Sequence, residues 1–182
     1  MTHLPRQTIT DGVSCRGHVT ATLHAVDDLR TACPEWDSLS KRQQLRVARG
    51  VQPVAESDTK NITKDALHTL LGDLLNPDTS DSTTASHLAI GDDGGSGTSA
   101  TGGLNNELAR IPVTDAIDNG KTLTLAGFFD STEANSGGDI DEGGAVTAAS
   151  GGSFLNQGTF AALSKSSSNT LTLTVDLSWS DS

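Results

Sequence analysis

Four residues near the N-terminus have side chains that could ligate a metal ion: Cys15, His18, His24 and Cys33. Thiolate and imidazole groups are ligands that tetrahedral zinc prefers, and the two residues between Cys15 and His18 are a usable spacing. The five residues between the histidines and the eight residues before Cys33 match no common zinc finger. A zinc site, a Cys15–Cys33 disulfide and two unpaired thiols all stay open, and the irregular spacing favours unpaired thiols.

Two acidic clusters beside paired glycines are candidates for a calcium or magnesium site. Asp139, Asp141 and Glu142 follow one Gly-Gly pair, and Asp92-Asp93 precedes another. Neither cluster has the alternating ligand positions and closing Glu of an EF-hand loop. Because an acidic chain contains many solvated acidic turns, we favour the interpretation that both clusters are solvated turns and not metal sites. The sequence therefore predicts no cofactor and gives a structural cation no clear support.

No catalytic arrangement is recognisable along the chain. Serines are abundant, but none lies in a Gly-x-Ser-x-Gly elbow with a matching His. The Gly-rich stretch 91–103 lacks the Gly-x4-Gly-Lys-Ser/Thr pattern of a phosphate loop. Carboxylate pairs for glycoside cleavage are recognised by their separation in space, which the sequence does not test. We therefore expect a protein that is not an enzyme.

Charge is distributed unevenly over the 182 residues. The chain has 12 Lys and Arg against 23 Asp and Glu, and residues 81–182 hold three cations and thirteen acids. Such a surface repels nucleic acid and anionic lipid, so neither is an expected partner. The acid excess, the scarcity of Lys and the lack of Tyr favour a protein that works in high salt, where screening shortens electrostatic repulsion. We find no signal-peptide pattern and no apolar run of membrane-spanning length.

Helical patterns occur only in the first part of the chain. A capping box at Ser40 and Gln43 predicts a helix near residues 40–50, and leucines at helical spacing predict another near 63–75. We therefore predict an N-terminal mostly helical attachment region over residues 1–80, followed by a linker over 81–86. The expected attachment or oligomer contacts are the basic and apolar side chains of the two helices: Arg42, Arg46, Arg49, Leu67, Leu70, Leu71 and Leu74.

Strand patterns dominate the second part. Residues 170–180 alternate between apolar and polar side chains, a period of two that predicts a strand with one buried face. Further short strands are predicted near residues 87–91, 107–113, 121–129, 139–148 and 153–161, with turns at Asn119-Gly120 and Gly151-Gly152. Alternation at residues 19–25 suggests another strand. We predict an antiparallel β-sandwich over residues 87–182 and hence an α+β fold class. The expected β core of the last strand is Leu171, Leu173, Val175, Leu177 and Trp179.

A series of short motifs runs through this second part in a fixed order. It begins with His87-Leu-Ala-Ile-Gly91 and Leu104-Asn-Asn-Glu-Leu-Ala-Arg110, and continues with Phe128-Phe-Asp-Ser-Thr-Glu-Ala-Asn135. Ile140-Asp-Glu-Gly-Gly144 and Leu163-Ser-Lys165 follow. In this order the motifs resemble a small β domain of tail-fibre and baseplate proteins of tailed viruses of bacteria and archaea. The chain departs from that family at Asp141, where a basic residue is usual, and at Ala145-Val146, where a large apolar pair is usual.

The resemblance implies a structural protein of a tailed virus particle, in the tail tip, baseplate or a fibre. Its implied partners are other tail proteins and copies of itself in a ring or trimer, and its implied location is the virion tail, assembled in the host cytoplasm. The acidic composition makes a virus of halophilic archaea the expected parent. The alternative is a receptor-recognition module that binds a host cell-surface glycan or S-layer protein through its loops.

Overall fold

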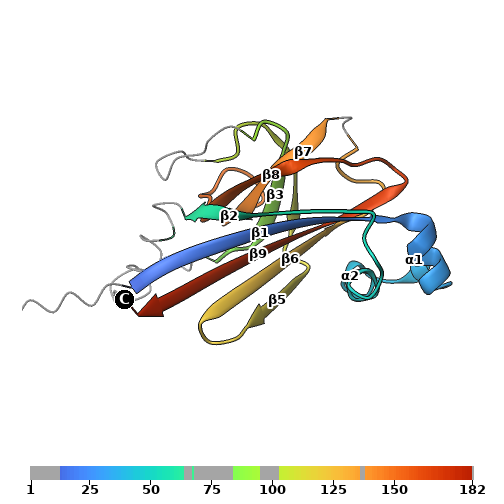
Figure 1. Cartoon of the computed structure of the whole chain (residues 1–182), viewed down its shortest axis with the longest axis horizontal. Coiled ribbons are helices and arrows are strands. Elements are labelled where there is room, and N and C mark those ends of the chain that lie inside the picture. Colours follow the sequence, from blue (N-terminus) through green and yellow to red (C-terminus); the bar gives the residue numbers. More distant parts are fainter. Residues whose placement is uncertain (1–12, 64–66, 68–83, 95–102, 136–137, 182) are drawn as a thin grey trace, which may run out of the picture.

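The structure is a computed structural model that describes residues 13–63, 67, 84–94, 103–135 and 138–181 of the chain (Figure 1). Most of the described residues lie in antiparallel strands. In chain order the elements are β1 (Val13–Ala25), α1 (Val26–Ala32), the 3₁₀ turn η1 (Trp36–Ser38), α2 (Lys41–Ala48), β2 (Ala55–Thr63), β3 (His87–Gly91), β4 (Glu107–Pro112), β5 (Asp115–Asp118), β6 (Thr122–Phe129), β7 (Asp139–Val146), β8 (Asn156–Ser164) and β9 (Asn169–Asp181).

The strands follow one another in the order β4-β3-β7-β8-β2-β1-β9-β6-β5, and all neighbouring strands are antiparallel. This series forms two layers, as in a sandwich. Gly127 of β6 lies against Leu88 of β3 and Ile111 of β4, and Gly143 of β7 lies against Leu173 of β9. At the junction of the two layers, β2 and β8 share a short ladder, with Ile62 opposite Gln157 and Thr63 opposite Asn156.

The core lies between the two layers. Leu171, Leu173, Val175 and Leu177 of β9 are buried, as their period-two pattern predicts, whereas Trp179 near the end of the strand is only half-buried. On β1 the same alternation buries Val19, Ala21 and Leu23, so the strand suggested there is confirmed.

The predicted α+β fold class is wrong, because the described residues are mostly β, and the error lies in the N-terminal half. Rather than forming a mostly helical region ahead of a sandwich, this half supplies two strands of the sheet, β1 and β2 (Figure 1). The reason is that β1 pairs along its whole length with β9, from Val13 opposite Asp181 to Ala25 opposite Asn169. Between β1 and β2 the chain forms two short helices and a 3₁₀ turn.

These short helices pack on the outer face of the sheet. Leu29, Trp36 and Leu45 are buried against Ala126 and Phe128 of β6. The rings of Trp36 and Phe128 meet edge to face with their centroids 5.9 Å apart. The segment with α1 and α2 therefore covers part of the outer face of the sheet, which the alternating pattern of β9 predicted to be exposed to solvent.

The predicted helix near residues 40–50 is present as α2, and its capping box is confirmed, with the backbone N–H of Ser40 donating to Oε1 of Gln43 at 3.0 Å. The predicted helix near 63–75 falls outside the described residues except for Leu67, which is buried in the main core. Leu70, Leu71 and Leu74 also lie outside the described residues.

Candidate binding pocket

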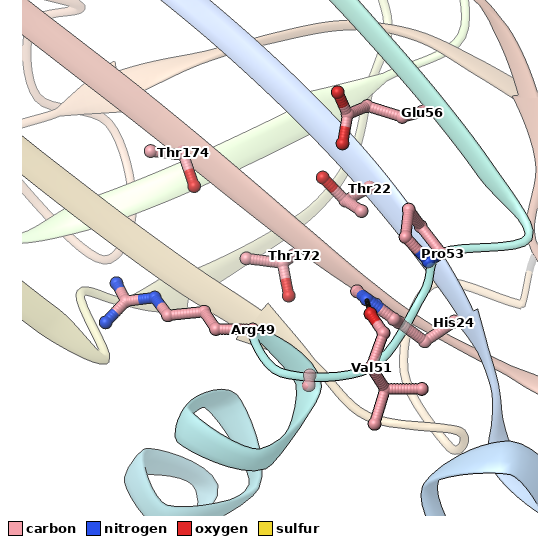
Figure 2. Close-up of a pocket in the computed structure, with 9 residues that line it drawn as sticks. Thr22, His24, Arg49, Val51, Pro53, Glu56, Thr172 and Thr174 are labelled. Carbon is pink, nitrogen blue, oxygen red and sulfur yellow. Dashed lines mark hydrogen bonds between the residues drawn. The ribbon is translucent and has the colours of Figure 1, made fainter.

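A cavity of about 210 Å³ lies where the segment after α2 crosses the outer face of the sheet (Figure 2). Its strand side is formed by Thr22 and His24 of β1, Thr172 and Thr174 of β9, and Glu56 of β2. The opposite side is formed by the end of α2 and the segment that leads to β2, through Ala48, Arg49, Val51 and Pro53.

Strand register brings the polar side chains of this cavity together. Thr22 lies directly opposite Thr172 on one side and opposite Glu56 on the other, so the three residues form a row across β9, β1 and β2. His24 and Thr174 are each two positions along their strands from this row, and therefore point to the same face. The opposite face of β1 and β9 is the one that enters the core.

Two buried polar atoms of this cavity have no hydrogen-bond partner. His24 and Thr172 are only 4% and 6% exposed, yet Nδ1 of His24 and Oγ1 of Thr172 are unpartnered. Nε2 of His24 lies 3.2 Å from the carbonyl oxygen of Val51, to which it donates. In the neutral ring Nδ1 is then an acceptor, and neither it nor the Thr172 hydroxyl is exposed to the open space of the cavity.

The ionisable residues of the cavity lining are His24, Arg49 and Glu56. Burial lowers the pKa of His24, against smaller opposing effects of the hydrogen bond to Val51 and of the Glu56 carboxylate. Arg49 extends away from the threonines in Figure 2, and its Nη1 donates to Oδ2 of Asp115 at 3.0 Å. The carboxylate of Glu56 belongs to an exposed residue at the rim, where water screens its charge.

The chemistry available here is binding rather than nucleophilic attack. An activated hydroxyl needs a hydrogen bond to a base, but Nδ1 of His24 bonds to none of the threonines.

The four metal candidates are not gathered at one place. Cys15 packs against the main core, whereas His18 and His24 lie on the outer face of β1. Nε2 of His18 lies 2.9 Å from Oδ2 of Asp58. Cys33 follows α1, and it and Cys15 are free thiols. Among the described residues no group of three or more His, Cys, Asp or Glu side chains is placed to hold a metal ion.

The acidic cluster on β7 is divided between different environments. Glu142 is fully buried, and its carboxylate accepts hydrogen bonds from the backbone N–H groups of Asn105 and Asn106 at 3.1 and 3.0 Å. The side-chain amide of Gln157 donates to it at 2.9 Å. Asp139, by contrast, is exposed. Glu142 therefore ties a loop to the strand.

Two of the three predicted basic contact residues bind within the chain itself. Arg42 and Arg49 are exposed, and both donate to the carboxylate of Asp115 on β5, at 2.9 and 3.0 Å. Arg46 is exposed as well. A strand of the same molecule thus supplies an acidic partner for two of these arginines.

Sequence reasoning missed a second group of charged residues, around Lys165. This side chain is 4% exposed, and its Nζ donates to the carbonyl oxygen of Glu133 at 2.6 Å and to Oδ1 of Asn135 at 3.0 Å. Burial lowers its pKa to about 8, although the charges of Asp130 and Glu133 act in the opposite direction. Its place at the end of the family-like motif Leu163-Ser-Lys165 was the only signal in the sequence.

Comparison of the chain with protein-family models, curated proteins and solved structures finds no match. Over the part of the chain that the structure describes, no helix has the length and apolar character needed to cross a membrane.

Proposed function

We propose that this protein is a structural component of the tail of a virus particle, in the tail tip, baseplate or a fibre. In this role it assembles with other tail proteins and with copies of itself, in a ring or trimer, and its virus infects halophilic archaea. It is made in the host cytoplasm and resides in the virion tail.

The observation that carries this proposal is the position of the charged residues within the family-like motifs. Glu142 binds the backbone of residues 105 and 106, and Lys165 binds the loop at residues 133 and 135. Arg110 donates to the carbonyl oxygens of Ala148 and Gly151 at 2.7 and 2.8 Å. Each of these side chains fastens a loop to the sandwich. The motifs that resemble the tail-fibre and baseplate domain therefore specify how the domain is built, which is what a structural role requires.

A second consideration is the surface charge. An excess of ten acids over cations in residues 81–182 is costly at low ionic strength, because exposed carboxylates repel one another. In molar salt the screening length is about 3 Å, which removes most of that cost. A particle released into brine has this environment.

The direct test is a quantitative mass-spectrometry inventory of particles purified from an infected halophilic archaeon. We expect this chain in intact particles at a fixed ratio to the major capsid protein, and in tails separated from heads. A viral protein that acts only inside the infected cell serves as the control for carry-over. Recovery of the chain from infected cells, but not from washed particles, would contradict the proposal.

A receptor-recognition role is the second candidate, and the pocket at His24 and Thr172 favours it. That role predicts that the purified protein binds intact host cells, or their isolated surface layer, in high salt. It also predicts that free protein competes with particles for adsorption. A purely scaffolding subunit would do neither.

A further inference from the structure

Two connections between the layers of the sandwich start and end beside each other. One leads from β6 to β7 and the other from β8 to β9. In one layer β6 pairs with β9, and in the other β7 pairs with β8, so the two connections cross between the layers at the same end. Lys165, the first residue after β8, reaches from the second connection to the first, where it contacts Glu133 and Asn135.

The amine of Lys165 is held against the side-chain amide of Asn135. Nζ of this lysine is 3.0 Å from Oδ1 of Asn135 and 2.6 Å from the carbonyl oxygen of Glu133, and the lysine is only 4% exposed. Since a C=O bond is about 1.2 Å long, the amide carbon Cγ of Asn135 lies at most about 4.2 Å from Nζ. A nucleophile and the carbon that it attacks need to be about 3–3.5 Å apart, a distance that a small rotation of either side chain reaches.

The amide of Asn135 is fixed from both sides. Its Nδ2 donates to the carbonyl oxygen of Ser131 at 2.7 Å, while its Oδ1 accepts from Lys165. The preceding residue, Ala134, has φ 54°, a left-handed conformation that is uncommon for a residue with a Cβ. At this residue the chain turns so that the Glu133 carbonyl and the Asn135 side chain meet the same amine. Backbone conformations that are costly to hold often occur at functional sites.

The surroundings of Lys165 favour the neutral amine, which is the nucleophilic form. Both of its hydrogen bonds go to uncharged oxygens, whereas a buried lysine is usually paired with an acid. The two acids whose charges act on it, Asp130 and Glu133, are instead bound by Lys41, whose Nζ lies 3.5 Å from Oδ2 of Asp130 and 2.5 Å from Oε1 of Glu133.

The pKa of Lys165 agrees with this geometry. Burial lowers it to about 8, although the charges of Asp130 and Glu133 act in the opposite direction. At neutral pH the neutral fraction of this amine is therefore roughly a hundred times that of an exposed lysine, whose pKa is about 10.4.

We propose that Lys165 and Asn135 become joined by an isopeptide bond that the folded protein forms on itself. Nζ of the neutral amine attacks Cγ of Asn135, which gives a tetrahedral intermediate with the negative charge on Oδ1. A proton passes from the attacking nitrogen to Nδ2, the bond between Cγ and Nδ2 breaks, and ammonia leaves. The products are one secondary amide and one ammonia molecule, so the reaction needs no oxidant, reductant or other reactant.

The neighbouring residues suit this reaction. The carboxylates of Asp130 and Glu133, whose charges act on the amine, are the acid–base groups around it that can relay the proton. Asn135 is exposed, so ammonia departs into solvent while the attacking amine stays buried.

The bond would close a covalent loop from residue 135 to residue 165 that contains β7 and β8. It would tie the two connections between the layers to each other, and Lys165 would then have no amine to titrate. This inference does not depend on the proposed function, because the reaction uses only groups of the chain itself. The chain can be present in particles without the bond, and the bond can form in a chain that is absent from particles.

The test is the intact mass of the purified full-length chain, kept in molar salt at pH 8, followed by peptide mapping. We expect a mass about 17 Da below that of the sequence, because one ammonia is lost. Digestion with trypsin and a protease that cleaves after Glu releases peptides 134–142, 143–165 and 166–182 from a chain without the bond. With the bond, 134–142 is joined to 143–182, since trypsin does not cleave after an acylated lysine.

The matched variants are Lys165→Arg and Lys41→Arg. Both keep a positive charge beside the same acids, but only the first removes the proposed nucleophile. We expect Lys165→Arg to keep its full mass and Lys41→Arg to lose ammonia as wild type does. Asn135→Ala should also keep its full mass, and because Asn135 is exposed this variant should fold even where a change at the buried Lys165 prevents folding.

A wild-type chain that keeps its full mass after days at pH 8 would overturn the proposal. A loss of ammonia that persists in Lys165→Arg would also overturn it. The same holds if the loss lies on an unlinked peptide 134–142, because an asparagine that cyclises to a succinimide loses ammonia without any lysine.

Discussion

Asp115 on β5 accepts a hydrogen bond from Arg49 at the end of α2, with 3.0 Å between Oδ2 and Nη1, although 66 positions separate the two residues in sequence. Oδ1 of the same carboxylate accepts from Arg42 at 2.9 Å. The side chain of Asp115 is 8% exposed, so the pair of arginines holds a nearly buried carboxylate. This contact fastens the helical excursion to the edge of the sheet, beside the cluster formed by Trp36 and Phe128.

The first prediction concerns these arginines. Arg42→Gln and Arg49→Gln should each lower the free energy of unfolding by about 0.5–1.5 kcal/mol, because each change removes a charge-assisted bond to Asp115. Arg46→Gln, on the exposed side of the same helix, should change it by less than about 0.5 kcal/mol. Urea denaturation at fixed salt measures all three. Equal losses at the three positions would show that general charge on the helix, and not the contact with Asp115, is responsible.

Acid should remove the same stabilisation. Burial raises the pKa of Asp115, but the hydrogen bonds and charges of Arg49 and Arg42 outweigh this effect and lower it below its ordinary value. A carboxyl whose pKa is lower in the folded state stabilises the fold above its unfolded pKa, about 3.9, and loses this contribution as the pH falls through the folded value. Asp115→Asn should therefore show a shallower loss of stability than wild type in that acid range.

The second prediction concerns the packing between the two layers. A Cβ at Gly143 would lie 2.9 Å from Cδ1 of Leu173, too close without a shift of the leucine. Gly143→Ala should cost about 1–3 kcal/mol through overpacking, and Leu173→Ala about 2–5 kcal/mol through the cavity it leaves. Because Leu173→Ala removes the atoms that the new methyl group meets, the double variant should cost less than the sum of the two.

The control for this pair is Gly50→Ala, where the added Cβ would approach no closer than 3.4 Å. It should leave stability nearly unchanged. Thermal or chemical denaturation of wild type, Gly143→Ala, Leu173→Ala and the double variant gives the coupling energy between the two positions. Strict additivity of Gly143→Ala and Leu173→Ala would mean that the two layers are not in contact at these residues.

The third prediction is a pH dependence at His24. Burial lowers its pKa in the folded state. The charged residues that line the cavity beside it are Glu56 and Arg49. Between the folded value and the unfolded value of about 6.5, the unfolded chain binds more protons, so stability falls as the pH drops through this interval. Unfolding free energies from pH 7.5 to 5 should show this fall in wild type and less of it in His24→Gln. Identical slopes in the two proteins would exclude the histidine as its source.

Much of the strand framework was predictable because its signals are local. Alternation over 170–180 predicted β9, and the Asn119-Gly120 turn between β5 and β6 is confirmed, with Gly120 at φ 80°. The strand β2, Ala55–Thr63, was missed because its sequence is mostly polar and lacks an alternating apolar pattern. It is placed by backbone pairing with β1, such as Thr22 opposite Glu56, which no local pattern reveals.

The fold class was mistaken for a related reason. The capping box at Ser40 and Gln43 correctly predicted α2, but a capping box does not tell whether a helix forms its own layer or covers a sheet. That outcome depends on Phe128, a residue far along the chain that presents an apolar surface on the outer face of β6. The pocket was equally hidden, since His24 and Thr172 meet only through the register of β1 and β9.

The fourth prediction concerns Lys165 while its amine is free, before a bond to Asn135 forms. Its pKa of about 8 in the folded state lies well below the unfolded value of about 10.4, so the unfolded chain binds more protons between these values. Stability contributed by this residue should therefore increase as the pH rises through that interval, by at most about 1.4 kcal/mol per pH unit. The difference in unfolding free energy between wild type and Lys165→Met should grow in favour of wild type from pH 8 to pH 10.

Comparing wild type with Lys165→Met is necessary because another group titrates in the same range. Burial raises the pKa of the Cys15 thiol, which makes stability fall with rising pH. This effect is present in both proteins and cancels in the difference. A difference that stays constant across the interval would show that Lys165 titrates alike in the folded and unfolded chains.

The last prediction concerns salt. Thirteen acids against three cations in residues 81–182 repel one another when the ionic strength is low, and this repulsion is stronger in the compact fold than in the extended chain. Melting temperatures should therefore fall steadily as NaCl is reduced from molar to tens of millimolar.

Sucrose stabilises proteins by exclusion from their surface without screening charge, so it should not replace the salt. Asp93→Asn, which removes one exposed carboxylate, should make the salt dependence shallower. A melting temperature that is flat or rises as salt is withdrawn would contradict adaptation to high salt, and with it the proposal that this protein belongs to a virus of halophilic archaea.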